Sequence, residues 1–161
     1  MTPEVSTAEQ VFKRWEQITS SILDQCLNLT LKRCLTVPYE KLVLQPERTM
    51  RHVLRFLDVP WDSSVLHHQQ YINKTTVLSR WEPSTAQVSY PIHLAALNSW
   101  AGPNSVLPQA FIRNAHKNSS LLWLLGYAKL NIPPSYGQPE PAIVHRTQKL
   151  FGDPQFRRVM Q

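Results

Sequence analysis

The segment CLTVPYEKLVLQPERTMRHVLRFLDVPW, residues 34–61, opens with an extended pattern and closes with a helical one. Alternating apolar side chains at Leu35, Val37 and Tyr39 predict a short strand. Pro38 counts against a central position in a sheet, because proline donates no hydrogen bond to a ladder. A single strand also needs a partner. Either this strand pairs with something outside the chain, or the segment is not a strand.

The rest of this segment, after Pro46, has the spacing of an amphipathic helix. Its apolar positions follow i, i+3, i+4 and i+7, at Met50, Val53, Leu54 and Leu57. Arginines project from other sides of the helix, at Arg48, Arg51 and Arg55. A charged face of this kind is usually only solvated.

Helical patterns extend over most of the remaining chain. A first helix is predicted from near residue 8, where Thr7 and Gln10 have capping-box spacing, to about residue 24. We interpret its apolar stripe as core packing; the stripe comprises Val11, Trp15, Ile18 and Ile22. Further helices are predicted over 63–70, 92–101, 108–125 and 142–151, with Gly126 as a C-cap. We see no internal repeat and no second domain.

Composition and charge narrow the class of protein. The chain has 161 residues, 42% of them hydrophobic, which suits one domain with a core and argues against disorder. Its net charge is +6, and residues 83–161 hold seven Lys or Arg against two Asp or Glu. Such a half favours anionic partners: nucleic acid, phosphorylated or sulfated nucleotides, acidic peptides or anionic lipid. Because the positive charges are scattered, a mildly basic solvated surface is the alternative.

Motifs that carry chemistry are few. The four glycines form neither a P-loop nor a dinucleotide fingerprint, and no serine lies in a nucleophile elbow. His67 and His68 are adjacent, which is poor metal-binding geometry on a helix. The longest apolar run, residues 121–125, is too short to span a membrane, and residues 1–10 do not resemble a secretory signal. From the residues alone we expect a soluble, basic, mainly helical domain.

The cysteines and sequons bear on the compartment. Cys26 and Cys34 are separated by a spacing that matches no zinc or redox motif. On count alone, two free thiols and one local disulfide are equally good interpretations. N-x-[ST] sequons begin at Asn28, Asn73 and Asn118, and they favour an oxidising, lumenal setting without establishing it.

Several stretches together resemble the protein-tyrosine sulfotransferases. The segment 34–61 resembles the family's region in which a strand ends in Tyr-Glu and a helix follows a Pro-Glu/Arg turn. SVLHHQQYINK at 64–74 resembles its Val-Leu-His-His stretch, and EPSTAQV at 82–88 its Glu-Arg-Ser-Thr-Asp-Gln-Val. LGYAKLNIPPSYGQPEP at 125–141 resembles its Leu-Gly-Tyr, Pro-Pro-x-Tyr-Gly and Pro-Asp-Pro motifs.

The match keeps the family's order from about Phe12 to Asp153 and resembles its C-terminal half only. It implies an α/β class, namely the C-terminal part of a P-loop-like sulfotransferase fold, with one partial sulfotransferase domain over 1–161. The family transfers a sulfuryl group from 3′-phosphoadenosine 5′-phosphosulfate to tyrosine hydroxyls of secreted or membrane proteins, without a metal. It does so on the lumenal side of the Golgi membrane, as a homodimer. The implied partners are acidic, tyrosine-containing segments of secretory proteins and a second copy of the complete protein.

The resemblance also implies site residues. Ser84 would donate a hydrogen bond that stabilises the transition state. Tyr39 would contact the nucleotide, and so would Ser84, Thr85, Gln87 and Val88. Without the resemblance, the loop that contains Ser84 and Thr85 is an ordinary polar turn and Tyr39 a half-buried aromatic.

Other positions match or depart from the family. Cys26 and Cys34 match a paired position, which favours a disulfide. Pro38 stands where the family has a second tyrosine-like residue, and Ser99 where it has a lysine near the nucleotide.

The phosphosulfate loop, the glutamate expected as general base and the membrane anchor belong to the family's N-terminal half. We therefore expect the 161-residue chain alone to be inactive and to bind no adenosine 3′,5′-bisphosphate at micromolar concentration. The alternative is an inactive partial fold that acts through binding or dimerisation. A nucleic-acid-binding module is the weakest interpretation, because no basic face is clustered. A strand without its sheet neighbours also predicts marginal stability in isolation.

Overall fold

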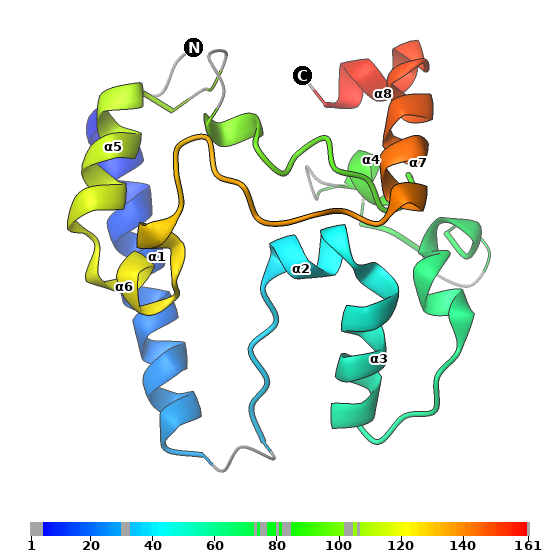
Figure 1. The fold of residues 1–161 in the computed structure, drawn as a ribbon, viewed down its shortest axis with the longest axis horizontal. Helices are drawn as coiled ribbons and strands as arrows, with labels where there is room; N and C mark the ends of the chain where they lie inside the picture. Colours follow the sequence, from blue (N-terminus) through cyan, green and yellow to red (C-terminus); the bar gives the residue numbers. More distant parts are fainter. Residues whose placement is uncertain are drawn as a thin grey trace. The chain divides into compact units, whose positions relative to one another are not determined.

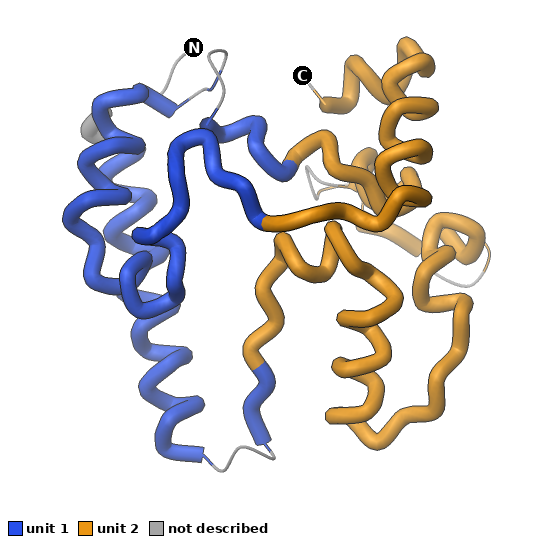
Figure 2. The backbone as a smooth tube through the Cα atoms, viewed as in Figure 1, with its two compact units in different colours: residues 1–35, 97–136 blue, residues 36–96, 137–161 orange. Residues whose placement is uncertain are grey.

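The computed structural model describes residues 5–29, 33–72, 74, 77–79, 81, 85–101, 105 and 107–160. The chain packs as two compact units, each made of two segments that are far apart in the sequence (Figure 2). Unit 1 contains Met1–Leu35 and Leu97–Tyr136, and unit 2 contains Thr36–Ala96 and Gly137–Gln161. The single partial sulfotransferase domain stays a prediction.

Helices form the regular structure of the described residues, which include no strand (Figure 1). Unit 1 holds α1 (Val5–Leu27), the 3-10 helix η3 (Ser99–Ala101), α5 (Gln109–Asn118), α6 (Ser120–Leu124) and η4 (Tyr127–Lys129). Unit 2 holds α2 (Tyr39–Leu44), α3 (Pro46–Phe56), η1 (Ser63–Leu66), η2 (His68–Gln70), α4 (Thr85–Val88), α7 (Pro141–Phe151) and α8 (Pro154–Val159).

The strand predicted over Leu35, Val37 and Tyr39 is wrong. Pro38 is extended, with φ −63° and ψ 126°, but it occupies the N-cap position of α2. The Leu42 N–H donates to the Pro38 carbonyl at 3.1 Å, which begins the helical bonding. Tyr39 is therefore the first residue of a helix. A run of three alternating apolar residues was too short to distinguish the two structures.

The helix predicted over 92–101 is also wrong, apart from η3 at its end. The Leu94 N–H donates to Thr147 Oγ1 at 3.0 Å, and the Ala95 N–H to His93 Nδ1 at 3.3 Å. Side chains thus accept bonds that a helix would form with backbone carbonyls.

The helix predicted over 108–125 breaks at Ser119. The Ser119 hydroxyl accepts the Leu122 N–H at 3.1 Å, which caps α6, and donates to Glu16 Oε1 on α1 at 2.5 Å. The predicted end at Gly126 is confirmed, because this glycine has a left-handed φ of 86°. Its N–H donates to the Trp123 carbonyl at 3.0 Å.

The first helix is confirmed, but its expected packing is not. α1 begins at Val5, so Thr7 lies inside its first turn rather than at a cap. The apolar stripe predicted as core is exposed, from 37% at Trp15 to 65% at Val11, with Ile18 and Ile22 between them. We call these four residues the α1 stripe. The buried side of α1 is turned toward α5 and carries Ala8 and Phe12.

Each unit has its own core. In unit 1, Ala8 packs with Phe111 and Ile112 of α5. In unit 2, Phe156 of α8 is completely buried, and rings at 4.9–5.5 Å surround it in edge-to-face geometry: Tyr90, His93 and Phe151. Asp153 caps α8 by accepting the Gln155 N–H at 2.8 Å.

Cys26 and Cys34 form a disulfide, as the resemblance implied, with their Cα atoms 5.6 Å apart. The bond closes a short loop after α1 within unit 1.

Candidate functional site

A pocket of about 350 Å³ lies within unit 2. Three residues that the sequence assigned to nucleotide binding line it together: Tyr39 of α2, and Gln87 and Val88 of α4. Its other lining residues come from α2, α3, η1, η2 and the segment after α4: Leu42, Val43, Met50, Val65, His68, Tyr90, Pro91, Ile92, His93 and Ala96. We call this cavity the unit 2 pocket.

Tyr39 owes its position to the start of α2. Pro38 fixes the entry to this helix, and the Tyr39 side chain stays 56% exposed at the pocket. Partial burial raises the pKa of Tyr39, and the adjacent Glu40 carboxylate raises it further. The phenol therefore stays protonated at neutral pH and is available as a hydrogen-bond donor.

The short helix α4 carries Gln87 and Val88. It begins at Thr85, whose hydroxyl donates to the Ser79 carbonyl at 2.6 Å. Thr85 itself is not among the described residues that line the pocket. Ser84, the predicted transition-state donor, lies outside the described residues.

His68 connects η2 to the end of α4. Its Nε2 lies 3.1 Å from the Val88 carbonyl oxygen and 3.1 Å from the Tyr90 carbonyl oxygen. Both partners are acceptors only, so Nε2 carries the proton and donates to them. Sequence reasoning missed this role because the partners lie 20 and 22 residues away. The pair of histidines was instead examined as a metal motif.

His93 was also missed. Its ring packs edge-to-face on Phe156 at 4.9 Å, and partial burial lowers its pKa. His93 is therefore a neutral polar group at the pocket at physiological pH.

The lining of the unit 2 pocket decides which ligand groups fit it. Among the residues that the structure describes, no Lys, Arg, Asp or Glu lines this pocket. Aromatic, aliphatic and neutral polar side chains suit a flat, uncharged ring system with hydrogen-bonding edges. They do not suit phosphate or sulfate groups, which need cations or several backbone donors.

Two further findings concern the described part of the chain. It holds no group of three or more His, Cys, Asp or Glu side chains arranged for a metal ion. Within the same residues, no helix is both long and apolar enough to cross a membrane. Ser99, at the position where the resemblance leads us to expect a lysine, lies in η3 of unit 1.

Comparisons with known proteins agree with the motifs. A sequence model described as the Sulfotransferase family matches residues 2–63. The protein-tyrosine sulfotransferase of Drosophila melanogaster is 38% identical over 149 residues, which cover 91% of this chain and 29% of the fly protein. Protein-tyrosine sulfotransferase A of Caenorhabditis elegans is 37% identical over 145 residues, 90% of this chain and 37% of the worm protein. Human protein-tyrosine sulfotransferase 1 is 40% identical over 113 residues, 69% of this chain and 30% of the human protein.

The match to the family model relates residues 2–63 to the sulfotransferases. With relatives at 37–40% identity along most of its length, it belongs to the protein-tyrosine sulfotransferase family. The chain spans about a third of the length of these relatives.

Proposed function

We propose that this chain is part of a protein-tyrosine sulfotransferase and that the unit 2 pocket holds the nucleoside end of its sulfate donor. The donor is 3′-phosphoadenosine 5′-phosphosulfate, and the acceptor is a tyrosine hydroxyl of a secreted or membrane protein. The observation that carries the proposal is the meeting of Tyr39, Gln87 and Val88 at one cavity. Tyr39 lies 48 positions before Gln87 in the sequence, so only folding brings the residue of α2 to those of α4.

The described residues that line the unit 2 pocket suit the nucleoside of the donor but not its charged groups. Tyr39 offers a half-exposed ring for stacking and a protonated hydroxyl, and Gln87 offers an amide with both donors and an acceptor. His68 holds the carbonyls of Val88 and Tyr90 and so fixes the edge of the pocket. Because none of the described residues that line this pocket is a cation, the phosphates and the sulfuryl group require other side chains.

Ser84 keeps its proposed role as a donor to the charge that develops during transfer. Removal of one such donor typically slows catalysis by about 100- to 1000-fold. A tyrosine hydroxyl with a pKa near 10 also needs a general base, for which we propose the glutamate of the family's N-terminal half.

A chimaeric enzyme tests the proposal. Residues 1–161 replace the matching segment of the Drosophila protein-tyrosine sulfotransferase, and transfer of radioactive sulfate to an acidic tyrosine peptide is measured. We expect transfer, about 100-fold slower after Ser84→Ala and about tenfold weaker donor binding after Gln87→Ala. Gln148→Ala, on the exposed side of α7, is the control and leaves the rate unchanged. If the chimaera is inactive while the fly enzyme is active in the same assay, the proposal is wrong.

The cellular setting is proposed with the activity. The Cys26–Cys34 disulfide supports an oxidising compartment, in keeping with the Golgi lumen. A net charge of +6 favours acidic acceptor segments through long-range attraction.

The second candidate is an inactive partial fold that forms a dimer. The exposed α1 stripe favours it, because contiguous apolar surface often marks a protein interface. Sedimentation equilibrium tests it: Ile18→Lys should convert a dimer to a monomer, and Gln17→Lys on the polar side should not. A monomer at all concentrations in the unaltered chain removes this candidate.

A further inference from the structure

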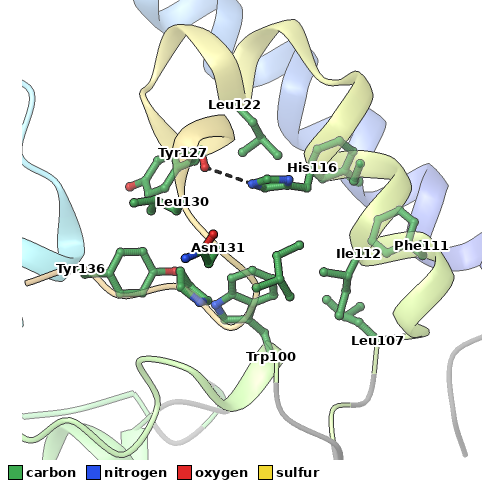
Figure 3. A pocket seen from close by; sticks show the side chains of 14 residues that line it. Trp100, Leu107, Phe111, Ile112, His116, Leu122, Tyr127, Leu130, Asn131 and Tyr136 are labelled. Atoms are coloured by element: carbon green, nitrogen blue, oxygen red, sulfur yellow. Dashed lines mark hydrogen bonds between the residues drawn. The ribbon is translucent and has the colours of Figure 1, made fainter.

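A second cavity is lined by residues of unit 1, and none of them lines the unit 2 pocket. Its volume is about 170 Å³. Its walls come from α1, η3, α5, α6, η4 and the extended segment that follows η4. Figure 3 labels the lining side chains from all of these except α1. We call it the ring pocket.

The walls of the ring pocket are mainly apolar. Trp100, Phe111, Ile112 and Leu122 enclose it, together with further aromatic and aliphatic side chains (Figure 3). Within the part of the chain that the structure describes, no Lys, Arg, Asp or Glu lines this cavity. A charged ligand would lose its hydration there without gaining an ion pair, so the occupant must be uncharged.

Two polar groups stand at one side of this cavity. The Nε2 atom of His116 lies 3.2 Å from the Tyr127 carbonyl oxygen and donates to it (Figure 3). With the proton on Nε2, Nδ1 of the neutral ring is an acceptor. The Asn131 side chain lines the same cavity. An occupant can therefore place one weakly polar edge on this side and apolar faces elsewhere.

Size narrows the ligand further. An engineered cavity of about 150 Å³ lined by Leu, Ile and Phe in another protein stays dry and binds benzene. The ring pocket has a similar volume and a mainly apolar lining, so one aromatic ring fits and a nucleotide does not. Water is a poor occupant of its apolar part, because a buried water needs two to four polar partners.

We propose that the ring pocket is a binding site for a small uncharged aromatic molecule of about one ring. Its lining residues differ from those of the unit 2 pocket, so this proposal does not rest on the proposed function.

Benzene is the first probe, added to the 161-residue chain and followed by methyl NMR. We expect saturable shifts at Ile112 and Leu122 and nuclear Overhauser contacts from benzene to both methyl groups. Benzoate, which matches benzene in ring size but carries a charge, should bind at least tenfold more weakly. Absence of saturable shifts overturns the proposal, and equal binding of benzoate overturns its claim that the ligand is uncharged.

A pair of variants on α5 locates the site. Ala115→Leu adds side-chain volume at the wall of the pocket and should weaken benzene binding at least tenfold. Ala110→Leu makes the same change at an exposed position of the same helix and should leave binding unchanged. Equal affinity in both variants contradicts the proposal. If Ala115→Leu does not fold, the benzene contacts in the unaltered chain decide the outcome by themselves.

Discussion

Phe156 and Phe111 are both buried phenylalanines on helices, but they have different surroundings. Phe156 of unit 2 is fully buried, with three rings against it. Phe111 of unit 1 is 8% exposed, meets the Phe12 ring at 5.8 Å and borders the ring pocket. A filled core holds the residues of the unit 2 pocket in fixed positions. An incompletely filled core instead leaves room for a ligand, at some cost in stability.

The largest expected effect compares these two phenylalanines directly. Phe156→Ala should lower the free energy of unfolding by about 3–5 kcal/mol, because it empties a closed aromatic core. Phe111→Ala should cost less, near the lower end of this range at about 3 kcal/mol, because one side of its ring already faces a cavity. Urea unfolding followed by circular dichroism measures both. Equal losses contradict the difference between the two cores.

The disulfide is the next test, and it acts on unit 1. Replacing both Cys26 and Cys34 by serine should lower the free energy of unfolding by about 2.5 kcal/mol, because the unfolded chain regains the freedom of the closed loop. Urea unfolding with and without a reducing agent measures the effect. The reducing agent should destabilise only the unaltered chain. If it also destabilises the double variant, its effect does not come from the disulfide.

Thr147 tests a single polar contact in unit 2. Thr147→Val keeps the shape but leaves the Leu94 N–H without its acceptor, which should cost about 1–3 kcal/mol. Thr147→Ser keeps the hydroxyl and is the matched control, with a smaller loss. Amide hydrogen exchange at Leu94 should speed up in the valine variant alone. Unchanged exchange there means that the bond does not order the segment.

The smallest expected effect is a pH dependence from His93. Burial lowers its pKa in the folded chain, so the unfolded chain takes up a proton first as the pH falls. The free energy of unfolding should therefore be highest above pH ~7.5 and decline as the pH falls through about 6.5. His93→Gln should flatten this decline in urea titrations between pH ~7.5 and ~5.5. His145→Gln, exposed on α7, controls for the loss of a histidine, and an identical slope in His93→Gln refutes the assignment.

Sequence reasoning succeeded where a strong helical period coincided with local signals. α1, α3 and α7 were predicted, since each has apolar residues at helical spacing and two of them begin at a proline. The failures have tertiary causes. Ser119 breaks a predicted helix, and besides capping α6 its hydroxyl donates to Glu16, 103 residues away. The α1 stripe has a core pattern but is exposed, and periodicity alone does not say which face is covered.

The site was predicted only through motifs. Tyr39, Gln87 and Val88 came from the family resemblance, and folding brings them to one pocket. His68 and His93 escaped detection because hydrogen bonds over 20 residues and ring packing on Phe156 leave no local signal. The role of Ser84 stays a prediction, since this residue is outside the described part.

The interleaving of the two units has a consequence for the order of events during synthesis. α1 ends about 80 residues before α5 begins, and α5 supplies its partner surface. At typical translation rates of about 5–20 residues per second, α1 waits roughly 4 to 16 s for that partner. Throughout this interval the side of α1 that carries Ala8 and Phe12 is exposed to other nascent chains, and so is the α1 stripe. A chaperone that binds α1 early would therefore raise the yield of folded protein more than one that acts after release from the ribosome.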